Sequence, residues 1–390
     1  MSAERPYDLV LYGATGFTGG LVAEYLATRL ADSPLRWAVA GRNAEKLDQL
    51  RRKLERIDPH LGELGMISAS SDDAESLRAM SAQARVLITT VGPYAQFGEP
   101  LVAACIETGT HYLDLTGEPD WWREIIGRYH ARAEAREVMV IPCCGFDSIP
   151  ADLGALFTAA QLPEGQPQTI DAYVRAKGDA SGGTWASMID ALAGMHGGRG
   201  RGGDRSGGGR SGGGQVGPKI HRVAATGRWA VPMPIIDPQV VRRSAALAGE
   251  SYGGALRYHH YLSLKSWTQV AGLIGFVGGL YLGTRFKPTR KLLAGIKKQG
   301  EGPSEEARAK HWFRLEFVGR GGGAEVRTHV SGGDPGYTET AKMIAEAAIT
   351  VVEDRDELPL RGGVLTPASA LGHALIERLQ AAGMEFAVDS

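Results

Sequence analysis

The chain is short of cysteine and has no surplus of either charge. Cys105, Cys143 and Cys144 are its three cysteines in 390 residues, and their spacing fits neither a zinc site nor a disulfide framework. The 43 Lys and Arg residues are matched by 44 Asp and Glu residues, so no basic surplus points to nucleic acid. The ten histidines make no metal-binding cluster in the sequence. We therefore expect a reducing, cytoplasmic setting, no metal and no nucleic-acid partner.

A signal sequence and a clear transmembrane segment are also missing. The first residues pass almost at once into a strand pattern, without a basic region followed by an apolar one. Trp267 to Thr284 carries no charge and, at 18 residues, reaches the lower edge of a transmembrane span. Its glycines and its polar start argue against a span. A buried helix, an apolar substrate channel and a membrane-surface contact all fit this segment.

Basic residues follow the uncharged segment, among them Arg285, Lys287, Arg290 and Lys291. An apolar segment followed by a basic one suits an interface with anionic lipid or with an acyl carrier. The alternative is a core or dimer helix with a solvated basic tail. The sequence therefore leaves open a peripheral membrane contact through Trp267–Thr284 and a homodimer.

What the sequence does contain is a glycine turn between a strand and a helix. Leu9 to Leu11 read as a buried strand, and apolar residues at helical spacing run from Phe17 to about Leu30. In this context Gly13 permits a tight turn, Gly16 lets the backbone approach a pyrophosphate, and Gly19 lets the helix pack close to the strand. The helix N-terminus then offers free N–H groups to phosphate. The predicted contacts from this turn are Gly13, Thr15, Gly16, Phe17, Thr18 and Gly19.

The end of the second strand indicates which dinucleotide binds. Residues 35–40 read as that strand and run into Gly41-Arg42-Asn43. An acidic residue here would bind the 2′-hydroxyl of NAD, whereas Arg42 suits a 2′-phosphate. The alternative is a solvated surface arginine. Asn43 can also cap the next helix. We predict NADP(H) as the cofactor.

Two further turns complete the predicted cofactor site. Ser71 follows a weaker third strand at 65–69, where adenine contacts often fall. Val91, Gly92 and Pro93 follow a fourth strand at 86–91. The carboxyl end of a central strand is where open α/β sheets hold ligands, so this turn is expected beside the nicotinamide. A helix is expected to follow it from Pro100 to Thr108, and Asp72 or Asp73 can cap the helix before the fourth strand.

The alternation of strands and helices predicts an α/β fold. Six such units up to Pro142 indicate a Rossmann-type, doubly wound parallel sheet within residues 1–155. Residues 156–333 read as an α+β substrate and dimerisation domain with an antiparallel sheet, because 312–318 and 324–330 have the pattern of a hairpin. Helices within 334–390 are expected to return to the first domain.

One segment of the second domain, residues 197–217, contains little but Gly, Arg and Ser. Such a composition cannot build a core and predicts a flexible loop or lid. An RGG-type nucleic-acid segment is the alternative, but no aromatic residues interleave with the arginines. Residues 182–192 just before it are expected to form a helix.

Six sequence motifs are spread along almost the whole chain. They are Gly-Ala-Thr-Gly-Phe-Thr-Gly at 13–19, Val-Gly-Pro-Tyr at 91–94, the run from Ala104 to Glu118, Cys-Gly-Phe-Asp-Ser-Ile-Pro-Ala-Asp at 144–152, Gly-Glu-Gly-Pro-Ser-Glu-Glu at 300–306 and Gly-Gly-Val-Leu-Thr-Pro-Ala at 362–368. Together they resemble the motifs of the saccharopine dehydrogenase-like oxidoreductases, and most of all those of the trans-acting enoyl reductase branch of that family. The Gly/Arg/Ser loop departs from the pattern, at a place where insertions cost little.

The resemblance implies an NADP(H)-binding domain and an α+β domain with substrate between them. In the enoyl reductase branch it implies hydride addition to an α,β-unsaturated acyl thioester, in trans with a polyketide synthase that makes long-chain lipids. The substrate would then be carried by an acyl carrier domain of that synthase.

Enoyl reduction needs a donor for the developing enolate oxygen and a proton for the α-carbon. Tyr94 is the first candidate, because its turn should lie beside the nicotinamide and its phenol could donate to the thioester oxygen. The alternative is a tyrosine that packs the turn. Asp147 and Ser148 follow the sixth strand at the same sheet edge and could orient substrate or relay a proton. Alternatively, Asp147 caps the helix that begins near Ile149.

Other polar residues near this edge are given lesser roles. Asp114 and Glu118 contact ribose or hold loops. Cys143 and Cys144 have no histidine beside them in the sequence, so we expect buried thiols rather than nucleophiles. His111 is expected to be structural.

Two other functions remain open at this point. A saccharopine reductase-like enzyme would form an amine from a 2-oxo acid and an amino acid, and its site would need several cations for the carboxylates. A lipid- or membrane-associated protein could instead keep the nucleotide fold without turnover. The glycine turn, Arg42 and the apolar segment favour an NADPH-dependent enoyl reductase.

Overall fold

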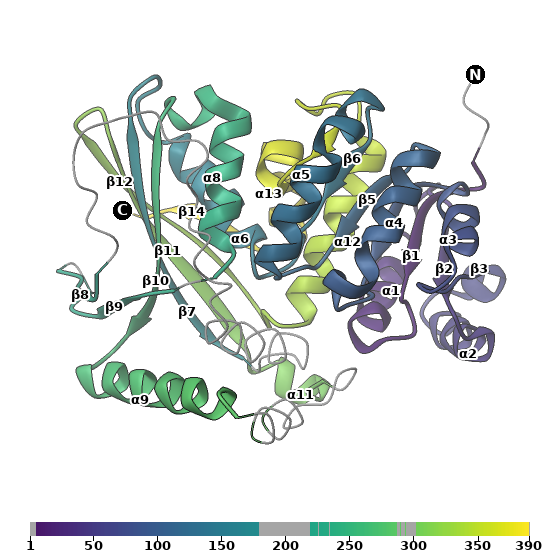
Figure 1. Ribbon diagram of the computed structural model, residues 1–390, viewed down its shortest axis with the longest axis horizontal. Helices are drawn as coiled ribbons and strands as arrows, with labels where there is room; N and C mark the ends of the chain where they lie inside the picture. The colour runs from purple at the N-terminus through teal and green to yellow at the C-terminus, as the bar shows by residue number, and fades with distance from the viewer. Residues whose placement is uncertain are drawn as a thin grey trace.

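The computed structural model describes residues 5–178, 219–224, 226–233, 235–286, 289, 293 and 302–389. They form two seven-stranded sheets with helices packed around and between them (Figure 1). The helix predicted at 182–192 and the Gly/Arg/Ser loop predicted at 197–217 lie outside the described residues.

The first sheet is parallel, which confirms the predicted fold class. Its strand order is β13-β6-β5-β4-β1-β2-β3, and the apolar runs of its central strands are buried, as parallel strands covered on both faces require. Six strands come from the N-terminal half as predicted, and the seventh, β13, comes from the C-terminal part and was not foreseen. The strands are β1 (Tyr7–Tyr12), β2 (Trp37–Gly41), β3 (Gly65–Ser68), β4 (Ala84–Thr89), β5 (His111–Asp114), β6 (Met139–Ile141) and β13 (Gly363–Val364).

Two helices of the first sheet, α2 and α3, begin at side-chain caps that the sequence predicts. Asn43 accepts from the N–H of Lys46 at 2.9 Å, and Asp73 accepts from those of Glu75 and Ser76. The helix predicted to start at Pro100 starts at Tyr94 instead, and Pro100 lies inside it. The elements are α1 (Phe17–Arg29), α2 (Ala44–Leu54), the 3₁₀ turn η1 (Pro59–Glu63), α3 (Ala74–Ser81), α4 (Tyr94–Thr108), α5 (Pro119–Ala135) and α6 (Ile149–Ala159).

The second sheet has the order β14-β12-β11-β7-β10-β9-β8. The predicted hairpin is confirmed, because β11 and β12 pair antiparallel and turn at Gly322 and Gly323, whose φ angles are 56° and 81°. The sheet is mixed rather than wholly antiparallel, since β7 and β10 run parallel. The strands are β7 (Gln168–Lys177), β8 (His221–Arg222), β9 (Trp229–Pro232), β10 (Leu256–Leu264), β11 (Trp312–Gly321), β12 (Ala324–Gly332) and β14 (Glu385–Val388).

The second sheet is accompanied by α6, which precedes its first strand, and by helices that follow that strand in the chain. α6 packs closely on it, and a Cβ at Gly154 would lie 2.3 Å from Cζ of Phe317 on β11. α9 lies along the edge of the molecule at the bottom of Figure 1. The remaining elements of this region are α8 (Asp237–Ala248), the 3₁₀ turn η4 (Gly249–Tyr252), α9 (Trp267–Thr284) and α11 (Glu305–Arg308).

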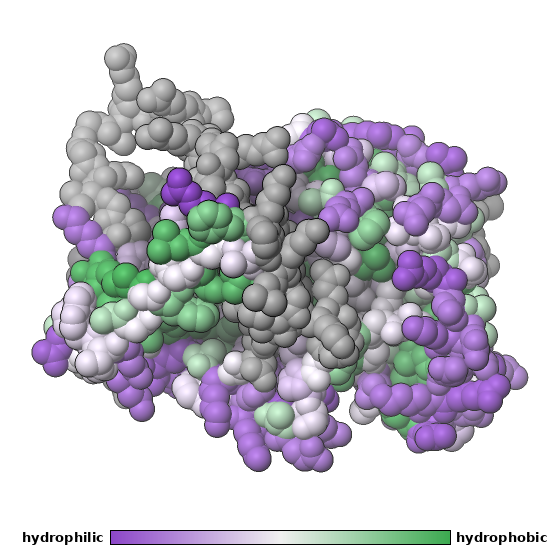
Figure 2. Space-filling view, turned by 60° about the horizontal axis from the view of Figure 1, so that its bottom comes forward, coloured by the Kyte–Doolittle hydropathy of each residue, from purple (hydrophilic) through white to green (hydrophobic). Residues whose placement is uncertain are grey.

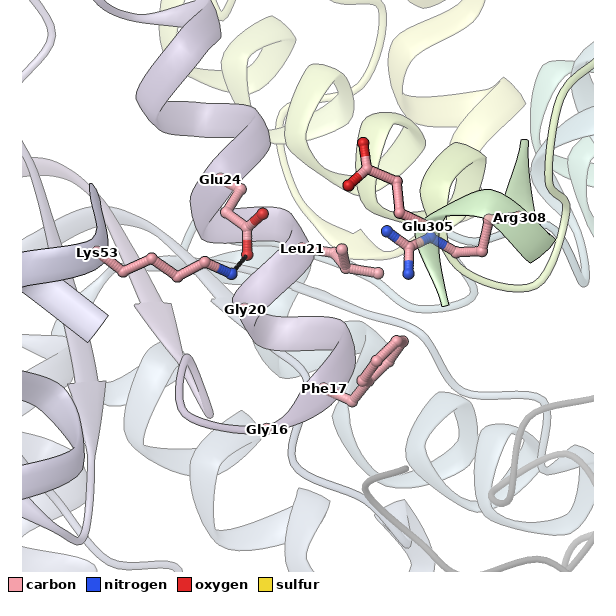
Figure 3. A pocket seen from close by; sticks show the side chains of 8 residues that line it. All are labelled: Gly16, Phe17, Gly20, Leu21, Glu24, Lys53, Glu305 and Arg308. Carbon is pink, nitrogen blue, oxygen red and sulfur yellow. Dashed lines mark hydrogen bonds and ion pairs between the residues drawn. The ribbon is translucent and has the colours of Figure 1, made fainter. Parts of the chain in front are cut away.

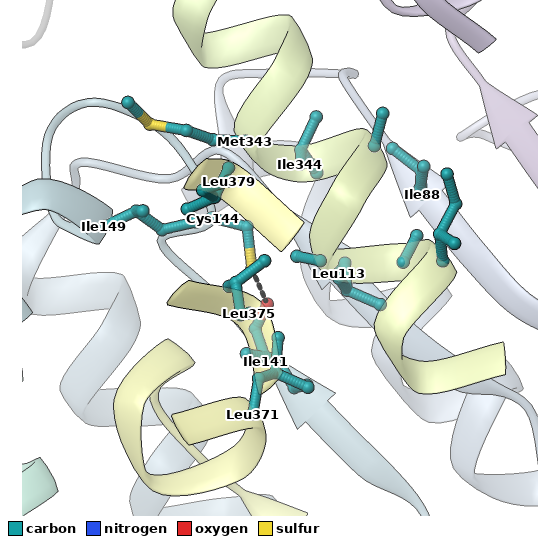
Figure 4. Packing of buried hydrophobic residues seen from close by; sticks show 14 of the residues in the cluster. Ile88, Leu113, Ile141, Cys144, Ile149, Met343, Ile344, Leu371, Leu375 and Leu379 are labelled. Atoms are coloured by element: carbon teal, nitrogen blue, oxygen red, sulfur yellow. Dashed lines mark hydrogen bonds between the residues drawn. The ribbon is translucent and has the colours of Figure 1, made fainter. Parts of the chain in front are cut away.

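Two C-terminal helices, α12 (Thr338–Glu353) and α13 (Pro367–Ala381), join the sheets. α12 packs on α1, β4 and β5, and α13 packs on α6. Their apolar residues meet those of the first sheet in one core, where Met343, Ile344, Leu371 and Leu375 lie near Ile88 and its neighbours (Figure 4). These helices therefore pack on the first sheet, but the boundaries at 155 and 333 stay a prediction. β14, which follows α13, pairs with β12 in the second sheet.

Candidate cofactor and active site

The glycine turn holds α1 tightly against the end of β4. A Cβ at Gly13 would lie 2.7 Å from Oγ1 of Thr90, and a Cβ at Gly19 would lie 2.2 Å from the carbonyl oxygen of Gly13. The φ of Gly13, 85°, also favours glycine. Gly16 is the N-cap of α1 and has no side chain to accept from the first turn. Because the first turn also carries no acidic residue, the helix N-terminus suits a phosphate group.

The other predicted cofactor residues lie around this turn. Arg42 ends β2 with an exposed side chain, and among the described residues no carboxylate is paired with it. Asn43 caps α2 with its side chain, and Ser71 lies beside the phenol of Tyr12. A free cation at the end of the second strand is what a 2′-phosphate requires. The residues of the turn therefore fit NADP(H), and each individual contact stays a prediction.

A pocket of about 310 Å³ opens beside the first turns of α1 (Figure 3). Gly16, Phe17 and Gly20 line one side, and Arg308 of α11 lines the other, with its guanidinium carbon 5.8 Å from the centre of the Phe17 ring. Gly302 packs so closely on this ring that a Cβ there would lie 2.2 Å from it. Gly302 and Glu305, which belong to the motif at 300–306, therefore lie beside the glycine turn, although more than 280 residues of sequence separate them from it.

Tyr94 occupies a buried position at the start of α4. Its hydroxyl donates to the carbonyl oxygen of Thr89 and accepts from the N–H of Leu115, both at 3.2 Å. Its ring packs on Trp121, with ring centres 5.7 Å apart, and burial raises the pKa of the phenol well above its usual value. These contacts describe the packing alternative. The catalytic role of Tyr94 stays a prediction that this geometry does not favour.

Asp114 and Glu118 hold loops together. Asp114 is buried and accepts from the hydroxyl of Tyr112 and from the N–H groups of Thr116 and Cys143. Burial raises its pKa to about 7. Glu118 accepts from the N–H of Tyr94 at 2.8 Å and from that of Ala95 at 3.0 Å. It thus caps α4 from a different loop, which explains why the helix begins before Pro100.

The thiols and the histidine behave as expected. Cys143 and Cys144 are buried, and burial raises the pKa of both thiols well above the usual value. A buried thiol of raised pKa is a poor nucleophile. His111 accepts from the N–H of Met139 at 3.0 Å, and burial lowers its pKa to about 3.

Asp147 presents a carboxyl group at the edge of the first sheet. The predicted cap is wrong, because Ser148 is the N-cap residue of α6 and no side chain bonds to the first turn. Asp147 is exposed, yet surrounding protein raises its pKa. Its oxygen is 3.2 Å from where a Cβ of Gly117 would lie, which places it beside the loop after β5.

Ser148, which follows Asp147 in the chain, is fully buried, and its side chain contacts a residue of the second domain. Its hydroxyl donates to Asp237 at 3.4 Å. Asp237 belongs to α8, and its other oxygen lies 3.6 Å from Nε2 of His260 on β10. The structure thus brings Asp147 and Ser148 to the sheet edge and adds two residues that the sequence did not indicate.

Comparison with known proteins agrees with this arrangement. Residues 9–141 match the family described as the saccharopine dehydrogenase NADP binding domain. A trans-acting enoyl reductase of Mycobacterium leprae is 34% identical, over 98% of this chain and 97% of the relative. A Mycobacterium tuberculosis protein provisionally named a trans-acting enoyl reductase is 37% identical, over 97% of each chain. The chain belongs to the saccharopine dehydrogenase-like family.

A solved structure supports the fold of this saccharopine dehydrogenase-like protein. The L-Glu-forming saccharopine dehydrogenase of Saccharomyces cerevisiae aligns with a TM-score of 0.55, over 98% of this chain and 100% of that one. At 14% identity, this likeness concerns the fold alone. Together with the matched NADP binding domain, the relatives support an NADP-dependent oxidoreductase and binding of NADP(H).

The uncharged segment of this saccharopine dehydrogenase-like protein forms α9 with the predicted bounds. It is not a buried helix, because Trp267, Ile274, Phe276 and Leu282 are each more than half exposed. Figure 2 shows apolar residues gathered along it on the surface. Within the part of the chain that the structure describes, no helix has the length and apolar character to cross a membrane, and no group of His, Cys, Asp or Glu is arranged to hold a metal ion.

Two residues near the candidate site, Asp237 and His260, have no recognisable signal in the sequence. Asp237 precedes a proline at a helix start and therefore resembles an ordinary capping residue, and His260 stands in an alternating strand. Arg308, likewise, lies in a short acidic and basic segment. Only the packing of the second domain on the first brings these side chains to the sheet edge or the glycine turn.

Proposed function

We propose that this protein uses NADPH to reduce the C=C bond of an α,β-unsaturated acyl thioester. The observation that carries the proposal is the likeness, over nearly the full length, to proteins named trans-acting enoyl reductases. By the same likeness, the substrate is carried by a separate polyketide synthase in a pathway that makes lipids. The reaction adds a hydride to the β-carbon and a proton to the α-carbon.

The chain's own residues are suited to hold the cofactor. The first turn of α1 offers N–H groups to the pyrophosphate, and Arg42 offers its guanidinium to a 2′-phosphate. Val91, Gly92 and Pro93 form the loop between β4 and α4, where the nicotinamide would lie. When bound, NADPH supplies the hydride.

For the proton, we propose Asp147 as the group next to substrate. Its carboxyl group is accessible, and the raised pKa favours the protonated form that an acid needs. Tyr94 is less suitable, because donation to Thr89 already engages its phenolic hydrogen. Ser148, the next residue in the chain, is buried, and its hydroxyl donates to Asp237.

The two rival functions find less support. An enzyme for amino acid and 2-oxo acid substrates needs cations near the reacting groups. Among the described residues no Lys or Arg is paired with Asp147, and the group that interacts with it, Asp237, is a second carboxyl group that offers no cation to a dicarboxylate substrate. A protein without turnover would have no use for the accessible carboxyl group of Asp147.

The test is NADPH oxidation, measured by absorbance, with a medium-chain enoyl thioester as substrate. We expect turnover with the thioester and none with saccharopine precursors. Asp147→Asn should lower kcat by about 100-fold or more, the typical contribution of general acid catalysis. Oxidation of NADPH with saccharopine precursors alone would favour the amino-acid enzyme. Oxidation with no member of the panel would favour a binding protein.

We propose a lipid surface as the partner of α9. The exposed face of this helix carries Ile274, Phe276 and Leu282 and no charge, while Lys265 precedes the helix and Arg285 follows it. Apolar side chains between cations suit the interface of an anionic membrane. This contact would place the enzyme near lipid-like acyl chains. A homodimer through the same face is the alternative.

A further inference from the structure

A line of buried polar side chains runs between the two domains, from the start of α6 to β10. Ser148 donates to Asp237 at 3.4 Å, Asp237 lies 3.6 Å from Nε2 of His260, and Nδ1 of His260 lies 2.9 Å from the hydroxyl of Tyr258. All four side chains are nearly inaccessible, with exposed fractions between 0% and 4%. Buried polar groups carry a cost unless they are paired, so a continuous line of them needs an explanation.

The two ends of this line open in different directions. At one end, Ser148 is next to Asp147, whose carboxyl group is accessible at the edge of the first sheet. At the other end, Tyr258 and His260 line a pocket of about 300 Å³ that also includes the exposed Arg242. Asp147 and Asp237 lie close enough for their charges to interact, so the line runs from beside the candidate active site to a solvent-facing pocket on the second domain.

The charges around Asp237 favour a stored proton. The carboxyl groups of Asp147 and Asp152 and the thiol of Cys143 face it from the α6 side, and His260 and Tyr258 face it from β10. No Lys or Arg is paired with Asp237 among the described residues. Burial, and then the charge of Asp147, raise its pKa well above the usual value. Burial lowers the pKa of His260 to about 4, so its ring is neutral and can accept a proton at one nitrogen and give one from the other.

We propose that Asp237 and His260 relay a proton, through Ser148, from the pocket at β10 to Asp147 and the substrate. This inference rests on the proposed function. In each turnover Asp147 gives its proton to the α-carbon while the β-carbon receives a hydride from NADPH. Asp147 regains a proton through the hydroxyl of Ser148 from Asp237, and Asp237 regains one from His260. His260 gives its proton from Nε2 and takes up one solvent proton at Nδ1. Exchange of that proton back to Nε2 restores the starting tautomer, so each turnover consumes one solvent proton and one hydride.

The 3.4 Å contact is a long hydrogen bond, and the 3.6 Å separation between Asp237 and His260 exceeds hydrogen-bond distance. The relay therefore requires both to shorten when substrate binds, as catalytic contacts often do. Asp237 and His260 touch neither substrate nor cofactor in this proposal, and they are therefore positioning and proton-supplying residues.

The test compares Asp237→Asn and His260→Gln with His259→Gln. His259 is a matched control, because it lines the same pocket but pairs with Asp171 at 2.9 Å instead of joining the line. With NADPH and a medium-chain enoyl thioester, we expect the first two variants to lower kcat about 100-fold. KM, NADPH affinity and Tm should stay close to those of the wild type. The solvent deuterium isotope effect on kcat should increase in both variants, and Asp237→Glu should restore part of the rate.

Two outcomes would overturn the relay. One is an unchanged kcat and isotope effect in both variants. The other is a fall in Tm and NADPH affinity that matches the fall in kcat, which is the behaviour of a structural contact.

A second readout does not depend on turnover. Infrared spectra of the purified protein should contain the band of a protonated carboxyl group at neutral pH. One component of this band should shift after exchange into D₂O and be lost in Asp237→Asn, whereas the component from Asp114, whose pKa is about 7, remains in both proteins. If the wild type oxidises no NADPH with any thioester, the proposed function fails, and the Asp237 component alone then decides whether Asp237 stores an exchangeable proton. Its absence from the wild type would refute the relay.

Discussion

Arg42 is an exposed cation at the end of β2, and its contribution to cofactor choice can be measured directly. A charged hydrogen bond contributes about 1.5–3 kcal/mol, so Arg42→Ala should weaken NADPH binding by about 10- to 100-fold. NADH affinity should change little, because NADH has no 2′-phosphate. Fluorescence titration of the purified protein with each nucleotide measures both values.

Arg56→Ala is the control for this comparison, since Arg56 is also an exposed arginine and lies just after α2. It should leave both affinities unchanged. Equal losses for NADPH and NADH in Arg42→Ala would assign Arg42 to the structure of the turn rather than to the phosphate.

Asp114 makes the stability of the fold depend on pH. Its pKa rises from 3.8 to about 7 on burial, so the folded chain keeps a proton that the unfolded chain has lost. The resulting stability is fully present below about pH 4 and is lost as the pH rises through about 7. Asp114→Asn cannot lose this proton and keeps an acceptor for the neighbouring N–H groups. Its Tm relative to the wild type should therefore increase between about pH 5 and 7 and then level off.

Thermal denaturation across this range provides the measurement. Asp356→Asn, at an exposed carboxylate, should give a constant difference from the wild type. A constant difference for Asp114→Asn as well would mean that Asp114 is ionised in the fold at pH 5.

At the scale of the element, α1 offers a matched pair of glycines. A Cβ at Gly19 would lie 2.2 Å from a backbone oxygen, whereas one at Gly20 would have its nearest neighbour at 3.9 Å. Gly19→Ala should cost about 1–3 kcal/mol, the usual cost of overpacking. Gly20→Ala should be neutral or stabilising by about 0.5–1 kcal/mol, because alanine favours the helix. Urea denaturation of the two variants measures the difference, and similar values for both would show that the turn relaxes easily.

The start of α4 shows why some element boundaries escape a sequence-based prediction. Pro100 suggested a helix start, because proline is favoured in the first turn. The actual start at Tyr94 depends on Glu118, which lies in the loop after β5. Its carboxylate accepts hydrogen bonds from the N–H groups of Tyr94 and Ala95 at the start of α4. Such a long-range cap leaves no local pattern, whereas the caps from Asn43 and Asp73 lie on their own helices and were predicted.

The proposed partner of α9 can be tested by flotation with vesicles that contain anionic lipid. A variant with Phe276→Asp and Leu282→Asp should no longer float, because two charges would replace side chains that are 55% and 61% exposed. Val388→Asp, at an exposed apolar residue of β14, should float like the wild type. Equal flotation of both variants would remove lipid as the partner. A change from dimer to monomer in the α9 variant would assign the face to a second copy.

At the scale of the whole molecule, the N-terminal sheet depends on the C-terminal part of the chain. α12 covers β4 and β5, and Glu346 of α12 accepts hydrogen bonds from Tyr25 and Arg29 of α1. A fragment of residues 1–155 would expose this apolar face. We expect it to show no cooperative thermal transition by circular dichroism, in contrast to the full chain. A fragment with a sharp transition would show that the first sheet is stable without α12, α13 and β13.

The sequence alone determined the features that depend on local spacing. Buried strands, amphipathic helices and the glycine turn each occupy a short stretch, so their patterns predicted the parallel sheet, the hairpin and the NADP(H) turn. The phosphate-binding role of Arg42 was predicted in the same way, because the prediction depends on its position at the end of a strand.

Tertiary structure decided what depends on residues far apart in the chain. It added β13 and β14 to the sheets, turned Glu118 into a helix cap, and engaged the phenol of Tyr94 in buried hydrogen bonds. It also brought Asp237 and His260 behind Ser148. The reason is physical. A strand partner, a hydrogen bond or a charge acts through space, whereas local periodicity reflects only residues that are close together in the chain.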